Sequence, residues 1–254
     1  MVIPRVLRFG TAALLLAAAA CSDGPADPEP TELGALADPE VPTFDIGPAG
    51  TTRGGPCVYS EADGRFTCPE MNRNGIVITR TFTLYDADGN VQAQFDRLTT
   101  ASMRTETTAK GTATGRDGGT ITVDRSGVML VSGMAGEETE RTLNGVENGT
   151  ITRSFTDRAG VAVQVSDVVT DSTLALVVPV PRDRANHWPL SGARVHAVTT
   201  THVVGGGEPR TFWRIVRETF DGSGVVQVEI TTERGTMTCT RDLANRTSTC
   251  GRHP

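Results

Sequence analysis

Residues 76–85 read IVITRTFTLY, and residues 101–114 read ASMRTETTAKGTAT. In the first run, large apolar residues recur at every second position over most of its length, with threonines between them. In the second run, a polar face alternates with a flatter face of small residues that includes Met103, Ala109 and Gly111. Such alternation, with many β-branched residues, is typical of strands that have one wet face. The two runs therefore predict antiparallel β-structure.

The same pattern continues along the chain, and no segment from residue 75 onward has a convincing helical period. Further strands are predicted at 91–98, 120–124, 127–132, 139–144, 149–156, 161–169, 172–178, 193–204, 211–220, 224–233 and 235–241. Turn sequences stand between them at 86–90, 117–119, 147–149, 157–160, 205–207 and 221–224. We therefore predict an all-β fold: an antiparallel meander of roughly ten or more strands forming a curved sheet, a half-barrel or barrel, or a sandwich.

The N-terminal 20 residues have the parts of a secretory signal. Arg5 and Arg8 form a positively charged start, and residues 9–20 form a short apolar run. A run of about 12 residues is too short to span a bilayer but fits a signal peptide. Ala18-Ala19-Ala20-Cys21 resembles the lipobox of bacterial lipoproteins, although Ala18 stands where that family usually has Leu. The resemblance implies that Cys21 is lipidated and becomes the new N-terminus; the alternative is a secreted soluble protein.

Residues 21–54 are expected to link this anchor to the folded domain. Residues 22–52 contain seven acidic residues, no Lys or Arg, and no hydrophobic period, which favours a flexible tether. The rest of the mature chain has 22 basic and 23 acidic residues, so it lacks the basic surplus typical of nucleic-acid binders. We expect a single domain over 55–254, although the proline-rich stretch 179–192 also allows a domain boundary there.

The cysteines favour two local disulfides. Lipidation of Cys21 leaves four cysteines, in two pairs that each enclose ten residues around a turn sequence. Residues equidistant from a hairpin turn face each other at a distance that suits a disulfide. The spacing therefore predicts Cys57–Cys68 and Cys239–Cys250, with a bridge between the two pairs as the alternative. A four-thiolate zinc site is disfavoured, because zinc-binding pairs are usually two to four residues apart.

The mature region also resembles a group of bacterial envelope lipoproteins for which no activity is established. The sequences that carry this resemblance are FTCP at 66–69, the strand at 76–84 followed by YDADGN at 85–90, PVP at 179–181, and WPLSG at 188–192. The resemblance implies a lipid-anchored envelope protein and assigns no functional residues.

No catalytic or cofactor motif stands out, so we expect no enzyme activity, no cofactor and no metal site. His196 and His202 share a face of one predicted strand, but about 20 Å separates them, and solvated surface histidines are expected. His187 is expected to pack or cap in its loop. Residues 86–90 resemble the start of a calcium loop, but Val91 and Arg97 replace its required Gly and Glu, so a turn is expected.

The remaining features bear weakly on function. The acidic residues are expected at turns or facing outward, so no acid–base pair is assigned. Trp213 is expected to anchor the core of the second part of the domain. Trp188 is expected to be structural too, and the alternative is that it plugs the mouth of a barrel or contacts a ligand.

Two functions are compatible with these features. The first is a non-catalytic structural or protein-interaction module, attached to the outer membrane through Cys21 and facing the periplasm or the cell surface. It follows from the lack of a catalytic constellation. The second is a carrier or sensor of an apolar ligand held in the curved sheet, which the small-residue face of 101–113 favours. The partners expected are thus the membrane and either an envelope protein or an apolar ligand.

Overall fold

The computed structural model describes residues 51–52, 55–115, 118–180 and 188–251. The predicted signal peptide, Cys21, His187 and most of the acidic segment lie outside these residues. The described residues are all-β and contain no helix, so none of their elements is a helix long and apolar enough to cross a membrane. The predicted all-β, antiparallel fold is confirmed.

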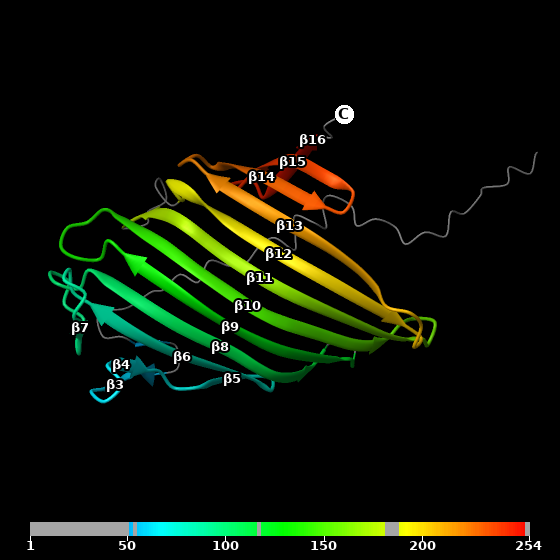
Figure 1. Cartoon of the computed structure of the whole chain (residues 1–254), viewed down its shortest axis with the longest axis horizontal. Coiled ribbons are helices and arrows are strands. Elements are labelled where there is room, and N and C mark those ends of the chain that lie inside the picture. The colour runs from blue at the N-terminus through cyan, green and yellow to red at the C-terminus, as the bar shows by residue number, and fades with distance from the viewer. Residues whose placement is uncertain (1–50, 53–54, 116–117, 181–187, 252–254) are drawn as a thin grey trace, which may run out of the picture.

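Sixteen strands are present among the described residues (Figure 1). Their bounds are β1 Thr51–Thr52, β2 Gly55–Pro56, β3 Val58–Ser60, β4 Arg65–Thr67, β5 Met71–Arg73, β6 Ile76–Tyr85, β7 Val91–Gln92, β8 Ser102–Thr114, β9 Thr120–Ser132, β10 Glu140–Thr156, β11 Ala162–Pro179, β12 Ser191–Val204, β13 Arg210–Phe220, β14 Val225–Thr232, β15 Gly235–Asp242 and β16 Thr247–Gly251. The first two form a separate small sheet, and the other 14 form one sheet.

The large sheet is an antiparallel meander that curves without closing. From β8 to β16 every strand pairs with its neighbours in sequence, and β3 and β16 are the two ends of the order. The predicted alternatives were a curved sheet, a half-barrel or barrel, and a sandwich. The structure has a single curved, open sheet (Figure 1). Strands β11 and β12, on either side of the proline-rich stretch, pair over 13 residue positions and so belong to the same sheet.

Several predicted strands are joined into longer ones. The predicted turn at 147–149 is wrong, because these residues lie inside the 17-residue strand β10. Gly149 faces Arg125 there: a Cβ atom on Gly149 would lie 2.4 Å from the Arg125 Cγ atom and 2.5 Å from the Asp124 carbonyl oxygen. This glycine gives room to a side chain of the neighbouring strand and is not part of a turn.

Three other strands begin or end at different residues from those predicted. Strand β9 runs through the predicted gap at 125–126, and β11 runs through the gap at 170–171. The strand predicted over 91–98 is limited to Val91–Gln92, because the following residues form turns around Asp96, whose carbonyl accepts hydrogen bonds from the Thr99 and Thr100 amides. Strand ends are decided by such local hydrogen bonds, which an alternation pattern does not reveal.

A β-bulge in β11 decides which residues form the core. Positions 163–173 place odd-numbered residues on the concave face, but the register shifts between Leu174 and Val177. Ala175 adopts a positive φ of 45°, and its amide donates a hydrogen bond to the Asn144 side-chain oxygen at 2.8 Å. Beyond the bulge the even-numbered Leu176 and Val178 point inward and are buried, whereas Leu174 remains exposed.

The two predicted disulfides are present. Cys57 bonds to Cys68 beside the β3–β4 hairpin, and Cys239 bonds to Cys250 across β15 and β16. The hairpins lie at opposite ends of the strand order. Each bridge therefore closes a terminal hairpin, where a strand has hydrogen-bonded neighbours on one side only.

Candidate functional site

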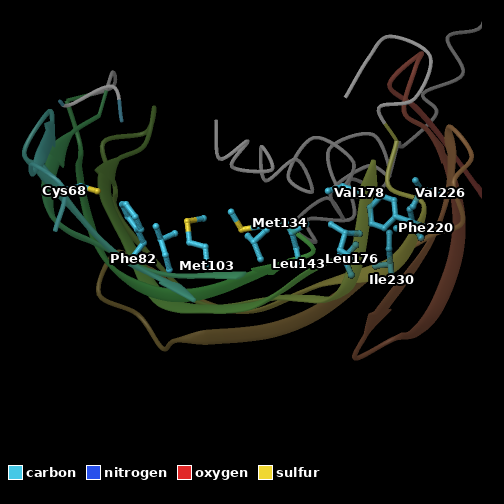
Figure 2. Packing of buried hydrophobic residues seen from close by; sticks show 14 of the residues in the cluster. Cys68, Phe82, Met103, Met134, Leu143, Leu176, Val178, Phe220, Val226 and Ile230 are labelled. Atoms are coloured by element: carbon cyan, nitrogen blue, oxygen red, sulfur yellow. The ribbon is translucent and has the colours of Figure 1, made fainter. Parts of the chain in front are cut away.

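The concave face of the sheet carries the apolar core. Leu84, Met103, Val131, Leu143 and Leu176 occupy consecutive paired positions from β6 to β11, and we call them the apolar row. Their exposed fractions lie between 0% and 6%. Buried side chains of β13 and β14, including Phe220 and Val226, belong to the same cluster. Figure 2 shows these side chains along the inner side of the curve.

This arrangement is unusual for a domain core, because the described strands that carry the apolar cluster form a single layer. Apolar faces of sheets are normally buried against a second layer of helices or strands. In the large sheet of the described residues, every strand belongs to the same antiparallel order, and no second sheet packs on the concave face. Among the described residues, the strands of the large sheet thus form one layer beneath the apolar row, whose side chains are themselves almost fully buried.

A belt of charged side chains crosses the concave face beside the apolar row. Its members follow from the pairing of the strands, since each lies at a concave position, two to ten residues along its strand from the buried apolar side chains. This charged belt consists of Arg80, Arg125, Glu147, Arg153, Asp167, Asp171, Arg194, His196, Arg214, Glu218 and Arg241. The belt thus contains six arginines, four carboxylates and one histidine, and Arg141 and Arg210 lie at further concave positions of β10 and β13.

The centre of the charged belt is a linked set of ion pairs. Arg125 Nη2 lies 2.6 Å from Asp171 Oδ2, and Arg125 Nε lies 2.8 Å from Glu147 Oε1. His196 Nδ1 lies 2.5 Å from the other oxygen of Asp171. The side chains of Arg125, Asp171 and His196 are each only about one-quarter exposed. Such partly buried pairs resist screening by salt better than pairs on an open surface.

The pKa of Asp171 is lowered despite its burial. Burial by itself would raise the pKa of this carboxyl group. The hydrogen bond and charge of His196, followed by the charge and hydrogen bond of Arg125, outweigh that effect. Asp171 is therefore held as a carboxylate and ties β9 to β12 across the face.

Glycines make room for the long side chains of this centre. Gly127 lies opposite Glu147, and a Cβ atom on Gly127 would lie 3.0 Å from the Cβ and Cγ atoms of Glu147. Gly149 provides the same space for Arg125. Glycine at these two positions therefore lets Arg125 and Glu147 lie close to the backbone of the neighbouring strand.

Two further groups extend the charged belt toward β13 and β15. Glu218 Oε1 lies 3.1 Å from Arg241 Nη1, and these are the least exposed of the ion pairs formed by the described residues, at 10% and 14%. Asp167 accepts a hydrogen bond of 2.7 Å from the Thr200 hydroxyl and lies 4.0 Å from Arg153 Nη2. The concave face is thus apolar along one row and charged beside it.

The prediction that the histidines are solvated surface residues is wrong for His196, which is ion-paired with Asp171 and partly buried. His202 lies on the same face, with its ring 5.3 Å from that of Phe212 in an edge-on contact. The prediction that the acidic residues point outward or lie at turns is also wrong for Glu147, Asp167, Asp171 and Glu218. Sequence alternation identifies the two faces of each strand but not which polar positions face a partner across the sheet.

The prediction for Trp213 is wrong, whereas Trp188 packs against a neighbouring turn. Trp213 does not anchor the core: it lies on the convex face and is 37% exposed, because its neighbour Phe212 occupies the concave position. Trp188 is half-buried, and a Cβ atom on Gly224 would lie 3.2 Å from its Nε1 atom. Trp188 thus packs close to the turn between β13 and β14.

The calcium-like sequence at 86–90 forms a turn. Asp86 Oδ1 accepts hydrogen bonds from the amides of Asp88 and Asn90, and Oδ2 accepts one from the Asn90 side chain. These bonds, the Asn90 side chain first, lower the pKa of Asp86. Among the described residues no group of three His, Cys, Asp or Glu side chains is placed to bind a metal ion.

No protein-family model, curated protein or solved structure matches this chain. The concave and convex surfaces of the sheet are accordingly the basis for a functional assignment.

Proposed function

We propose that this protein is a non-catalytic, lipid-anchored protein of the cell envelope whose curved sheet holds an apolar ligand on its concave face. The observation that carries the proposal is the apolar row, which crosses five strands of a sheet with no second described layer. The ligand contacts this row through half-buried apolar side chains packed against it, such as Met129 of β9, and each Å² of apolar surface that becomes buried contributes about 25 cal/mol. The lipobox resemblance at Cys21 supports the lipid anchor.

Binding of a neutral apolar fluorophore, N-phenyl-1-naphthylamine, tests the ligand site. Met129 lies on the concave face, two residues from Val131 of the apolar row, and Leu130 lies on the convex face of the same strand. Met129→Trp fills the concave side and is expected to weaken fluorophore binding by about tenfold or more, or about 1.4 kcal/mol. Leu130→Trp serves as the matched control and should leave binding unchanged. Equal binding by the wild type and both variants would place the fluorophore elsewhere and contradict the proposal.

A protein-interaction module is the second candidate, and the convex face favours it. Large apolar side chains on this face are 37–56% exposed: Leu130, Val146, Val168, Leu174, Trp213, Ile215 and Val225. Exposed apolar side chains of this size are typical of surfaces that contact other proteins when they lie together in one patch. A photo-crosslinking amino acid at position 213 should capture an envelope protein in cells, whereas the same group at concave position 212 should not. Crosslinks of equal yield from both positions would argue against a convex interface.

A further inference from the structure

The two faces of the sheet carry opposite net charge. In β6 and β8–β15, the concave positions hold eight arginines and four carboxylates, whereas the convex positions hold three basic and five acidic side chains. The concave set is Arg80, Arg125, Arg141, Arg153, Arg194, Arg210, Arg214, Arg241, Glu147, Asp167, Asp171 and Glu218. The convex set is Arg104, Lys110, Arg217, Glu106, Asp124, Glu140, Glu229 and Asp242. A negatively charged segment is therefore attracted to the concave face.

Three of the concave arginines lie together at the end of the strands away from the apolar row, and we call them the distal arginines. Arg153 of β10 and Arg210 of β13 occupy one row of paired positions, with Val165 and His202 between them. Arg214 lies four residues along β13 from Arg210. The Arg153 side chain is half exposed and Arg210 is exposed. Unlike the apolar row, this end of the face is accessible to another segment.

The described residues of the sheet supply one carboxylate to the distal arginines. Asp167 lies 4.0 Å from Arg153 and already accepts a hydrogen bond from the Thr200 hydroxyl. Its charge also acts on Arg214, whose Nε atom is buried without a hydrogen-bond partner. Arg210 forms no ion pair within the part of the chain that the structure describes. Three positive charges thus share a single negative one.

The two turns beside the distal arginines do not remove this excess. Arg158 and Glu208 carry opposite charges in the β10–β11 and β12–β13 turns. The Asp157 carboxylate accepts hydrogen bonds from the amides of Ala159 and Val161 in its own turn. The distal end of the concave face therefore retains a positive charge.

The chain itself contains a segment of the opposite charge. Residues 27–40, DPEPTELGALADPE, hold five acidic residues and no Lys or Arg. Leu33 and Leu36 stand among them, and the exposed Phe212, between Arg210 and Arg214 on β13, offers these leucines an apolar contact. The segment thus matches the distal end of the face in both charge and apolar character.

We propose that residues 27–40 bind to the distal arginines of the same chain. Exposed ion pairs are individually weak, but attachment within one chain gives the segment a high effective concentration at the arginines. Binding shortens the free link between the domain and the predicted lipid anchor at Cys21. The inference goes beyond the proposed function, because the apolar row lies at the other end of the strands.

The segment is long enough to reach the distal arginines. Cys57 is fixed by its disulfide to Cys68, which directly follows β4. Seven strand spacings and eight residue positions separate β4 from Arg210, or about 43 Å along the sheet. The 17 residues from Glu40 to Cys57 span up to about 56 Å when extended. The acidic residues before Glu40 have a still longer reach.

Photo-crosslinking within the full-length protein tests the inference. The amino acid p-benzoylphenylalanine is placed at position 36, and a dilute sample favours crosslinks within one molecule. We expect mass-spectrometric mapping to find the crosslink at concave residues near Phe212, such as Val165 and His202. The yield should fall about fivefold when the salt concentration is raised to about 0.5 M, because salt screens exposed ion pairs.

Charge-matched variants test the assignment to the distal arginines. Replacing all three with glutamine should reduce the yield about fivefold. Replacing Arg104, Lys110 and Arg217 with glutamine removes the same number of positive charges from the convex face and should leave the yield unchanged. The double variant Arg153→Gln/Arg210→Gln keeps the partly buried Arg214 and should still lose about twofold or more. Urea unfolding of each variant checks that the fold is preserved.

The outcomes separate this inference from the proposed function. Crosslinks on convex residues, or none within the molecule, would overturn the docking of the segment. Equal yields from the concave and convex variants would overturn the assignment to the distal arginines. Binding of N-phenyl-1-naphthylamine should be the same in all these variants, and its loss in the distal variants would contradict the separation of the two sites.

Discussion

The concave and convex faces of the sheet differ in the side-chain contacts that stabilise them. On the concave face, side chains pack into one cluster and form linked ion pairs that reach from β9 to β12. On the convex face, threonine hydroxyl pairs recur between neighbours, such as Thr79 with Thr108 at 2.7 Å and Thr201 with Thr211 at 3.0 Å. These contacts join adjacent strands only. Stability and binding should therefore depend mainly on concave residues.

The strongest test of this difference uses two leucines of β11. Leu176 is fully buried on the concave side, whereas Leu174 is 43% exposed on the convex side. Leu176→Ala should lower the free energy of unfolding by about 2–5 kcal/mol, because it removes packed methyl groups and leaves a cavity. Leu174→Ala should cost less than about 0.5 kcal/mol. Urea unfolding measures both, and similar losses would mean that the two faces contribute alike.

The close approach at Gly149 provides the next test. Gly149→Ala places a Cβ atom against the Arg125 side chain and the Asp124 backbone, which should cost about 1–3 kcal/mol. Gly251→Ala is the control, because a Cβ atom there would meet nothing within 4 Å. Thermal and urea unfolding of both variants measure the effect. A Gly149→Ala protein as stable as the wild type would show that Arg125 moves away at no cost.

Breaking an ion pair on each face should change the free energy of unfolding by amounts that differ less than those for the two leucines. Asp171→Ala leaves partly buried Arg125 and His196 without their shared carboxylate and should cost about 1–3 kcal/mol. Asp124→Ala removes an exposed partner of Lys110 from the convex face and should cost less than about 1 kcal/mol. Equilibrium unfolding in moderate salt compares them, and a larger loss for Asp124→Ala would contradict the comparison.

Acidification sharpens the same comparison. The pKa of Asp171 is lower in the folded protein than the value of about 3.9 expected when it is unfolded, so its stabilising effect is complete above that value. The effect is lost as the pH falls from about 3.9 through the folded pKa. The stability difference between wild type and Asp171→Ala should therefore shrink with falling pH. A difference that stays constant down to low pH would mean that the carboxylate charge contributes nothing.

The smallest expected effect concerns the bulge that changes the face of β11. Ala175 has a positive φ, which costs an L-residue about 1–2 kcal/mol. Ala175→Gly relieves that strain, and part of the gain is offset by the greater freedom of glycine in the unfolded chain. We expect a net stabilisation of about 0.5–1 kcal/mol in urea unfolding. Destabilisation by this substitution would show that the Ala175 methyl group contributes packing that outweighs the strain.

Much of the fold follows from local sequence patterns. Alternation in 76–85 and 101–114 predicts antiparallel strands, because side chains of a strand point to opposite faces with a period of two. Equal cysteine spacing around two turn sequences predicts the disulfides Cys57–Cys68 and Cys239–Cys250. Asp-containing turns at 86–90, 157–160 and 221–224 are also predicted correctly, since an Asp carboxylate binds the amides two or more residues ahead.

The candidate site is less accessible to sequence reasoning. Arg125, Glu147, Asp171 and His196 are far apart in the chain and meet only because four strands pair in one register. A one-residue change of register would place any of them on the opposite face. Their sequence surroundings of Thr, Ser and Gly look like those of any wet strand. The only available signal was the glycines at 127 and 149, which point to a close approach within a strand.

The amino-acid sequence by itself determined the strand type, the turns and the two disulfides of this protein, because each depends on residues close together in the chain. The tertiary structure decided that the sheet stays open and which face of each strand is inside. It placed a bulge at Ala175 that turns Leu176 inward, and it brought the charged belt together. These features depend on pairing between distant strands, whose register is set by the packing and hydrogen bonds of the whole sheet.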